Sequence, residues 1–278
     1  MMRKVAWGAV AALVVLPAVA EGQEWRTVTM SRQLERVEDL RVFVEYGAGH
    51  FTVRSVDEDL LYRMQLEYDE EKFEPVADFA SDRLRLGVES IGRNVSINTR
   101  RTGSLELELP RGVPMDLDLE FGAVSAEIDL GGLALTDLDV STGASESYVE
   151  ISELNSEEIG TATFEAGAAE FTAMGLGNLN ADRIEVDAGV GSITLGLDGS
   201  WQDDGYVSID MGLGALELRI PEGVGVRLKK DSFLTAIDSE GLIKRGDTFE
   251  SPDFDDAERR VEIDIDAAFG AISVVWTR

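Results

Sequence analysis

Seven short stretches of the chain share one spacing of apolar and polar residues. In each, apolar residues alternate with other residues up to an anchor position. A glycine (once an alanine) follows, and the apolar residues then resume one position out of phase. Strict alternation places every second side chain on one face of a β-strand. The anchors are Tyr46, Phe121, Thr142, Ala166, Ala188, Met211 and Ala267.

The change of phase at the glycine predicts a bend, because an extra residue lets the chain turn while its apolar side chains stay inside. From Phe121 to Met211 the anchors recur at steps of 21, 24, 22 and 23 residues. A step of about 22 residues is typical of one coil of a parallel β-solenoid. The alternative is an antiparallel meander of hairpins, for which Asp198-Gly199 offers one turn signal. The pattern favours an all-β, single-stranded parallel β-solenoid (β-helix).

The ends of the repeat are less regular than its middle. The long intervals between the anchors Tyr46 and Phe121, and between Met211 and Ala267, predict longer strands or capping elements. Two irregular strands are expected near the start, at Leu60–Tyr68 and Arg83–Glu89. We therefore expect four segments: a signal peptide over 1–20, a polar, poorly ordered lead-in over 21–36, a strand-rich portion over 37–109, and regular solenoid repeats over 110–278.

The start of the chain has the pattern of a secretory signal peptide. Arg3 and Lys4 form a basic start, an apolar run covers 5–16, and small residues at 18–20 form a cleavage site. The alternative is a membrane anchor, which needs about 20 apolar residues. We expect cleavage after Ala20, export to the periplasm or the cell surface, and no transmembrane segment in the mature chain.

Charge and residue types exclude several classes of function. The 54 acidic and 25 basic residues give a formal net charge of −29, which opposes binding to nucleic acid. The chain has no cysteine and a single histidine, His50, which excludes thiolate catalysis and His/Cys zinc sites. We expect a surface histidine and no enzymatic activity. The acidic turn over 198–205 lacks the spacing of an EF-hand, and we expect a solvated connection there.

The outward position just before the anchor is acidic in six of the seven repeats. In register, Glu165, Asp187 and Asp210 would form a row of like charges about 4.8 Å apart. Each adjacent repulsion costs about 1 kcal/mol in water. We expect no resident cofactor, and hypothesise that the row recruits divalent cations such as calcium, or a basic partner; a solvated strand face is the alternative. The seven residues are Glu45, Glu120, Ser141, Glu165, Asp187, Asp210 and Asp266.

Four segments of the sequence resemble segments of known protein families: Val42–Gly49, Ile220–Val224, Phe249–Phe254 and Ile263–Gly270. With them the chain, over about residues 37–278, resembles the toastrack (LiaF-like) and adhesin-like β-strand-repeat families of bacterial envelope proteins. The resemblance implies a right-handed solenoid with an irregular strand-rich N-terminal portion, and it supplies no catalytic residues.

The sequence and this resemblance together suggest a non-enzymatic, exported, adhesin-like scaffold at the cell envelope. Its partner would be an envelope protein or a glycan. Two alternatives stay open. One is an envelope-stress regulatory module, since some relatives are tethered to the membrane and act in such signalling. The other is a polysaccharide-active β-helix enzyme, because acidic pairs that could hydrolyse glycosidic bonds are abundant.

Overall fold

The computed structural model describes residues 24–35, 37–92 and 102–277. The expected signal peptide over 1–20, with its cleavage site after Ala20, lies outside the described residues. The first strands are β1 (Trp25–Gln33), β2 (Leu40–Val56), β3 (Leu60–Asp69), β4 (Phe73–Ala80), β5 (Arg83–Ser90), β6 (Gly103–Pro110), β7 (Pro114–Asp129), β8 (Ala134–Thr142) and β9 (Glu146–Glu150). The later elements are β10 (Ile159–Met174), the short 3-10 helix η1 (Leu176–Asn178), β11 (Ala181–Gly196), β12 (Gly205–Pro221), β13 (Val224–Asp238), β14 (Ile243–Arg245), β15 (Thr248–Glu250) and β16 (Arg259–Thr277).

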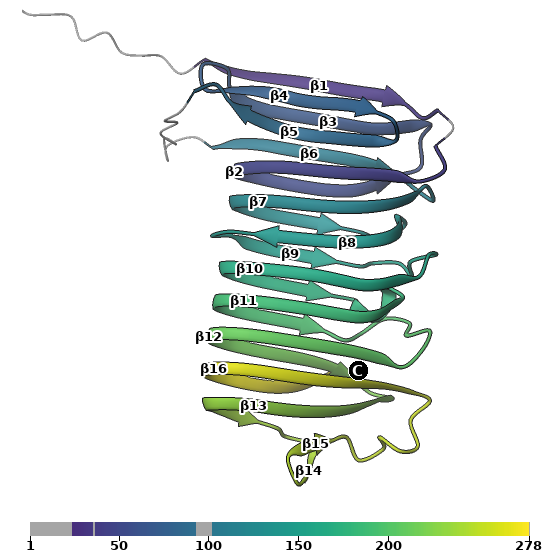
Figure 1. Ribbon diagram of the computed structural model, residues 1–278, viewed down its shortest axis with the longest axis vertical. Helices are drawn as coiled ribbons and strands as arrows, with labels where there is room; N and C mark the ends of the chain where they lie inside the picture. The colour runs from purple at the N-terminus through teal and green to yellow at the C-terminus, as the bar shows by residue number, and fades with distance from the viewer. Residues whose placement is uncertain (1–23, 36, 93–101, 278) are drawn as a thin grey trace, which may run out of the picture.

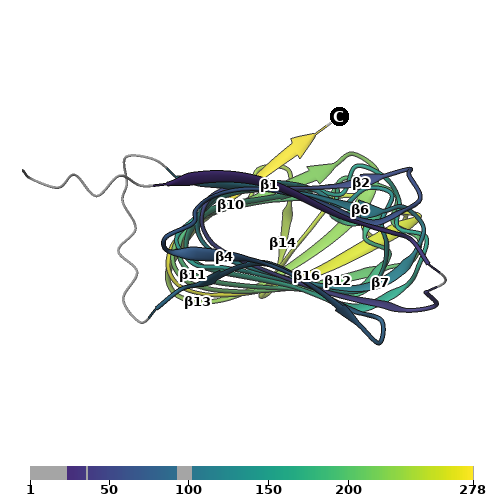
Figure 2. The ribbon, with the colours of Figure 1, turned by 90° about the horizontal axis from the view of Figure 1, so that it is seen from above.

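Long strands stack in parallel and in register through the centre of the molecule (Figure 1). For example, Phe164 of β10 pairs with Val186 of β11, which pairs with Ile209 of β12. The stack encloses a flattened interior between two walls, which is visible from above (Figure 2). The prediction of an all-β protein is confirmed. The repeats pair in parallel, and the antiparallel meander is therefore not their arrangement.

The interior is filled by the inward-facing residues of both walls. Phe121 lies against Phe51, with ring centroids 5.4 Å apart, and Phe51 lies against Tyr46 at 5.9 Å. Further along the stack, Phe164 and Phe171 pack at 5.8 Å. Full burial of such a side chain contributes about 1.5–3 kcal/mol. The alternation seen in the sequence therefore corresponds to one continuous apolar core.

The bends are lined by glycines because the coils approach closely there. A Cβ added to Gly122 would lie 2.4 Å from the carbonyl oxygen of Gly47, and one added to Gly212 would lie 2.5 Å from that of Gly189. Such contacts are too short for any side chain, so the stacking itself demands glycine. We call the outward-facing set directly after the first six anchors the glycine column; its members are Gly47, Gly122, Gly143, Gly167, Gly189 and Gly212.

The N-terminal end of the stack is closed by strands that pair differently. β1 pairs antiparallel with β3, β3 with β6, and β4 with β5. β3 and β5 lie where irregular strands were expected. The expectation that 21–36 is a poorly ordered lead-in is wrong for Trp25–Gln33, which is β1. It forms a strand because Val28 and Met30 pack against the core while the backbone pairs along β3.

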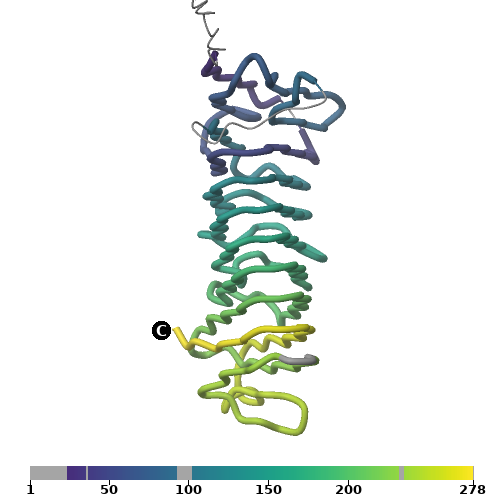
Figure 3. The backbone as a smooth tube through the Cα atoms, turned by 90° about the vertical axis from the view of Figure 1, so that its left-hand side faces the viewer, coloured from purple at the N-terminus to yellow at the C-terminus, as the bar shows by residue number. Residues whose placement is uncertain are grey.

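The C-terminal end does not follow the order of the chain. β16 lies between β12 and β13 and pairs in parallel with both (Figures 1 and 3). Met211 therefore stacks on Ala267, although β13, β14 and β15 separate them in sequence. The long interval between these two anchors holds the elements at the far end of the stack, where β15 pairs antiparallel with β13 and β14.

Candidate functional site

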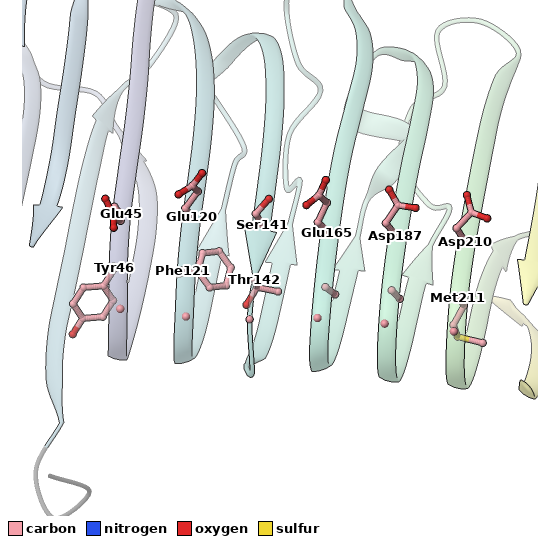
Figure 4. A pocket seen from close by; sticks show the side chains of 18 of the residues that line it. Glu45, Tyr46, Glu120, Phe121, Ser141, Thr142, Glu165, Asp187, Asp210 and Met211 are labelled. Atoms are coloured by element: carbon pink, nitrogen blue, oxygen red, sulfur yellow. The ribbon is translucent and has the colours of Figure 1, made fainter. Parts of the chain in front are cut away.

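Strand pairing brings the predicted acidic positions into one row along the stack of strands. Figure 4 shows the first six of these side chains on successive strands, pointing the same way. Parallel pairing in register makes each position fall beside its equivalent in the next coil. The order in space is Glu45, Glu120, Ser141, Glu165, Asp187, Asp210 and Asp266, each paired with the next.

One more carboxylate joins this row. Asp231 of β13 pairs with Asp266 of β16 and extends the row by one coil. The sequence did not reveal it, because Ser232 and Phe233 follow Asp231 where the repeat has an anchor and a glycine. The alternation of the buried Val226 and Leu228 was the only available signal. We call these eight positions the acidic column.

The carboxylates of the acidic column repel one another. Partial burial raises the pKa of Asp210, and the charges of Asp187 and Asp266 raise it further. These two residues are its neighbours on either side in the row. Any cation that binds along the column therefore relieves a repulsion already present in the folded protein.

A second group of carboxylates lies on the same strands, toward the N-terminal end of the stack. Asp116 pairs with Asp137, and Asp118 pairs with Asp139. Partial burial raises the pKa of Asp118 to about 6, and the charges of Glu120 and Asp139 add to this. On β7, three outward positions in succession carry acids, and two of these acids lie beside acids of β8.

A groove of about 860 Å³ runs along the acidic column. Its lining combines the acidic column, from Glu45 to Asp266, with the whole glycine column and the first six anchor residues. Because glycine has no side chain, the backbone of each bend is accessible beside a carboxylate, or beside Ser141 in one coil. The groove is therefore long, open, negatively charged on one side, and formed of equivalent positions from successive coils.

An exposed apolar row lies two positions beyond the anchors. Val190, Leu213 and Phe269 are 52%, 50% and 45% exposed, and they pair in register. Earlier coils carry alanine at this position, at Ala123 and Ala168. We call Val190, Leu213 and Phe269 the apolar ridge. It gives the bend an apolar surface beyond the glycine column at the C-terminal end of the groove.

The remaining candidate residues stay outside this groove. His50 is exposed, as expected, and its neighbours in register are Ser104 and Ser125. In the turn over 198–205, Asp198 accepts a hydrogen bond from the backbone N–H of Gly175 at 3.1 Å, so this carboxylate holds two turns together. Within the part of the chain that the structure describes, no three acidic or histidine side chains gather as a metal site.

Comparison with solved structures gives weak likenesses over most of the chain. A proposed cell adhesion protein from Clostridium sporogenes has a TM-score of 0.46 and 18% identity, covering 91% of this chain and 100% of that one. A proposed adhesin from Bacteroides fragilis has a TM-score of 0.37 and 11% identity, over 90% and 97% of the two chains. A proposed adhesin from Parabacteroides merdae has a TM-score of 0.33 and 10% identity, over 91% and 97%.

No curated protein matches the sequence significantly. Over 24–35, 37–92 and 102–277, no helix has the length and apolar character needed to cross a bilayer. One family model, described as the N-terminal domain of toast_rack, DUF2154, matches residues 20–174 and 163–219. This is more than half of the 278 residues, and residues 220–278 lie beyond the match. The chain therefore belongs to the toast_rack N-terminal domain family.

Proposed function

We propose that this protein is an adhesin-like, non-catalytic binding scaffold, exported to the bacterial cell envelope, and that the groove along the acidic column is its binding surface. The observation that supports this most directly is the register of the carboxylates along one open groove. A site of this kind has many equivalent positions and no convergent set of unlike groups. It suits the binding of a long ligand better than chemistry at one bond.

The ligand that fits this groove best is an extended polycation, such as a basic peptide or an amine-bearing polymer of the envelope. Carboxylates about 4.8 Å apart offer a series of sites for amines along the axis. Lysine-like side chains also have apolar stems, which can lie on Val190, Leu213 and Phe269 while their amines reach the acids. Each ammonium would offset part of a repulsion of about 1 kcal/mol per adjacent pair.

Divalent cations are the second ligand to consider for the same row. Calcium prefers six to eight oxygen ligands around one point. The carboxylates of the acidic column instead stand side by side on successive strands, which favours the polycation. Thermal unfolding with and without millimolar calcium tests the alternative: an upward shift of Tm that is lost in the variant below would favour calcium over the polycation.

The polycation is tested by titrating a fluorescent octalysine into the protein and measuring anisotropy at several salt concentrations. The test variant is Glu165→Gln/Asp187→Asn/Asp210→Asn. The matched control is Glu127→Gln/Glu146→Gln/Glu170→Gln, which removes the same charge from exposed residues outside the groove. We expect the test variant to weaken binding about tenfold or more, and the control to change it by less than about threefold. Equal losses in both variants would mean non-specific attraction and would refute the groove as the site.

Three finer points belong to the same proposal: cleavage after Ala20, right-handed winding with coils of about 22 residues, and the division at 109/110 between the N-terminal portion and the regular repeats. Cleavage has a direct test. Amino-terminal sequencing of the exported protein is expected to start at Glu21. A start at Met1 would contradict export by a cleaved signal peptide.

A further inference from the structure

The last strand of the chain, β16, lies between two strands that come before it in the sequence. β12 ends at Pro221 and β13 begins at Val224, so only two residues connect them. The two strands nevertheless stand two strand spacings apart, because β16 lies between them and pairs in parallel with both (Figure 3). At about 4.8 Å per spacing, they are about 10 Å from each other. We call the space between β12 and β13 the slot.

β13 cannot take the place of β16 against β12. A Cβ on Gly270 of β16 would lie 1.9 Å from the carbonyl oxygen of Gly214 of β12. The residue of β13 that pairs with Gly270 is Thr235. If β13 packed directly on β12 in the same register, the Cβ of Thr235 would meet that oxygen, and only glycine fits so close an approach. The slot therefore stays open until a strand with glycine at this position enters it.

The outward side chains of β16 match those of the slot. Arg227 and Lys229 of β13 pair in register with Glu262 and Asp264 of β16, so two basic positions meet two acidic ones. Arg227 Nη1 lies 2.8 Å from Glu262 Oε1. On the other side of the slot, the hydroxyl of Tyr206 donates a hydrogen bond to Asp264 Oδ2 at 2.7 Å. Complementary charge fixes register and suppresses wrong partners, so the slot selects the sequence of β16.

The connection that precedes β16 has the properties of a hinge. Its first part is held, because the backbone N–H of Ser251 donates to the carbonyl oxygen of Val226 at 2.8 Å and Phe254 is buried. The four residues Asp255–Glu258 follow, and three of them are exposed acids. Four extended residues span about 13 Å, and like charges favour an extended connection. β16 can therefore leave the slot as a unit while β13 and β15 keep their contacts.

We propose that copies of this chain exchange β16, so that β16 of one molecule fills the slot of a second molecule. The contacts inside the slot are the same in both arrangements, because the inserted sequence is the same, and only the hinge differs. In the exchanged pair, Asp266 of one molecule completes the acidic column of the other, and Phe269 completes its apolar ridge. Two grooves joined in this way bind a long ligand with higher avidity. The exchange itself does not depend on which ligand the groove binds.

The test uses single-cysteine variants of the full chain, which has no cysteine of its own. Asp210 of β12 and Asp266 of β16 are neighbours in register, and a Cα separation of about 4.8 Å is one that a disulfide can join. Asp210→Cys and ¹⁵N-labelled Asp266→Cys are refolded together from urea at a low and a high concentration, then oxidised. The disulfide-linked heterodimer, identified by mass, is expected to increase with concentration. Its yield should be several times that of the control pair Asp210→Cys and Glu127→Cys, because Glu127 is on β7, which does not adjoin β12.

Further variants separate exchange from chance contact. Asp210→Cys/Asp266→Cys in one chain is expected to close within the chain at low concentration, and failure to close would contradict the pairing on which the proposal rests. Asp266→Cys/Gly270→Ala places a methyl group against Gly214 and is expected to reduce the heterodimer to the control yield. Asp266→Cys/Ala271→Ser, a small change at the exposed next residue, is expected to keep it. A heterodimer at the control yield, or one that Gly270→Ala leaves unchanged, would overturn the proposal.

Discussion

The close approach of neighbouring coils at the bends can be tested with one added methyl group. Gly214 of β12 lies between Gly191 of β11 and Gly270 of β16. In Gly214→Ala, the new Cβ would be 1.8 Å from the carbonyl oxygen of Gly191 and 2.9 Å from its carbonyl carbon. Both are backbone atoms, so no side chain can rotate away to relieve the contact.

The cost can be estimated from this geometry. An acceptable contact requires the two coils to separate locally by about 1 Å or more. Backbone hydrogen bonds near 2.9 Å do not survive such a displacement. Losing one or two of them costs about 1 kcal/mol each, and overpacking adds about 1–3 kcal/mol. We therefore expect Gly214→Ala to lower the free energy of unfolding by about 2–5 kcal/mol.

The matched control is Gly47→Ala, also at a bend. A Cβ at Gly47 would have no atom within 4 Å. Where the conformation is compatible, glycine to alanine stabilises a protein by about 0.4–1 kcal/mol through the unfolded chain. Urea unfolding, followed by far-UV circular dichroism, gives both free energies. If the two variants differ by less than about 1 kcal/mol, the glycines are not required by stacking and the explanation is wrong.

Two further predictions concern the core and the acidic wall. Phe164→Ala is expected to lower the free energy of unfolding in urea by about 3–5 kcal/mol, because Phe164 is fully buried against Phe171. Val190→Ala, at an exposed position, should change it by less than about 0.5 kcal/mol. Similar losses in the two variants would contradict a continuous core. Asp118 has its pKa raised to about 6 in the folded state, so the folded protein binds the proton more tightly than the unfolded chain does. The contribution of Asp118 to the free energy of unfolding is therefore expected to fall as the pH rises from about 4 to about 6, and to stay level at higher pH. Asp118→Asn should reduce this slope and be more stable than the wild type at pH 7, and an unchanged slope between pH 4 and 7 would show that another group is responsible.

Much of this architecture was visible in the order of residues along the chain. Alternation interrupted at a glycine predicted a bent strand, because only a shift of phase keeps apolar side chains on the inner face after a turn. The regular spacing predicted parallel stacking. In such a stack, the equivalent outward positions of successive coils form a row. This is why Glu165, Asp187 and Asp210 could be placed together before their pairing was known.

Other features depended on contacts between segments far apart in the sequence. β1 forms a strand because it pairs with the edge of β3. The residues of Trp25–Gln33 alone do not predict this pairing. Asp231 joins the acidic column only because β16 is inserted between β12 and β13. The local pattern of residues determines which secondary structure a segment can form. Which strand edges pair is determined by the faces that pack together in three dimensions.

The surroundings of Tyr46 show the same division most clearly. The sequence alone identified Tyr46 as an anchor, like six other residues, and predicted an inward side chain. Only the fold places it at the point where the pairing of β2 passes from β5 to β6. The physical reason is that a residue's neighbours in the next coil, and therefore its burial and its hydrogen-bond partners, are set by the whole stack and not by its own segment.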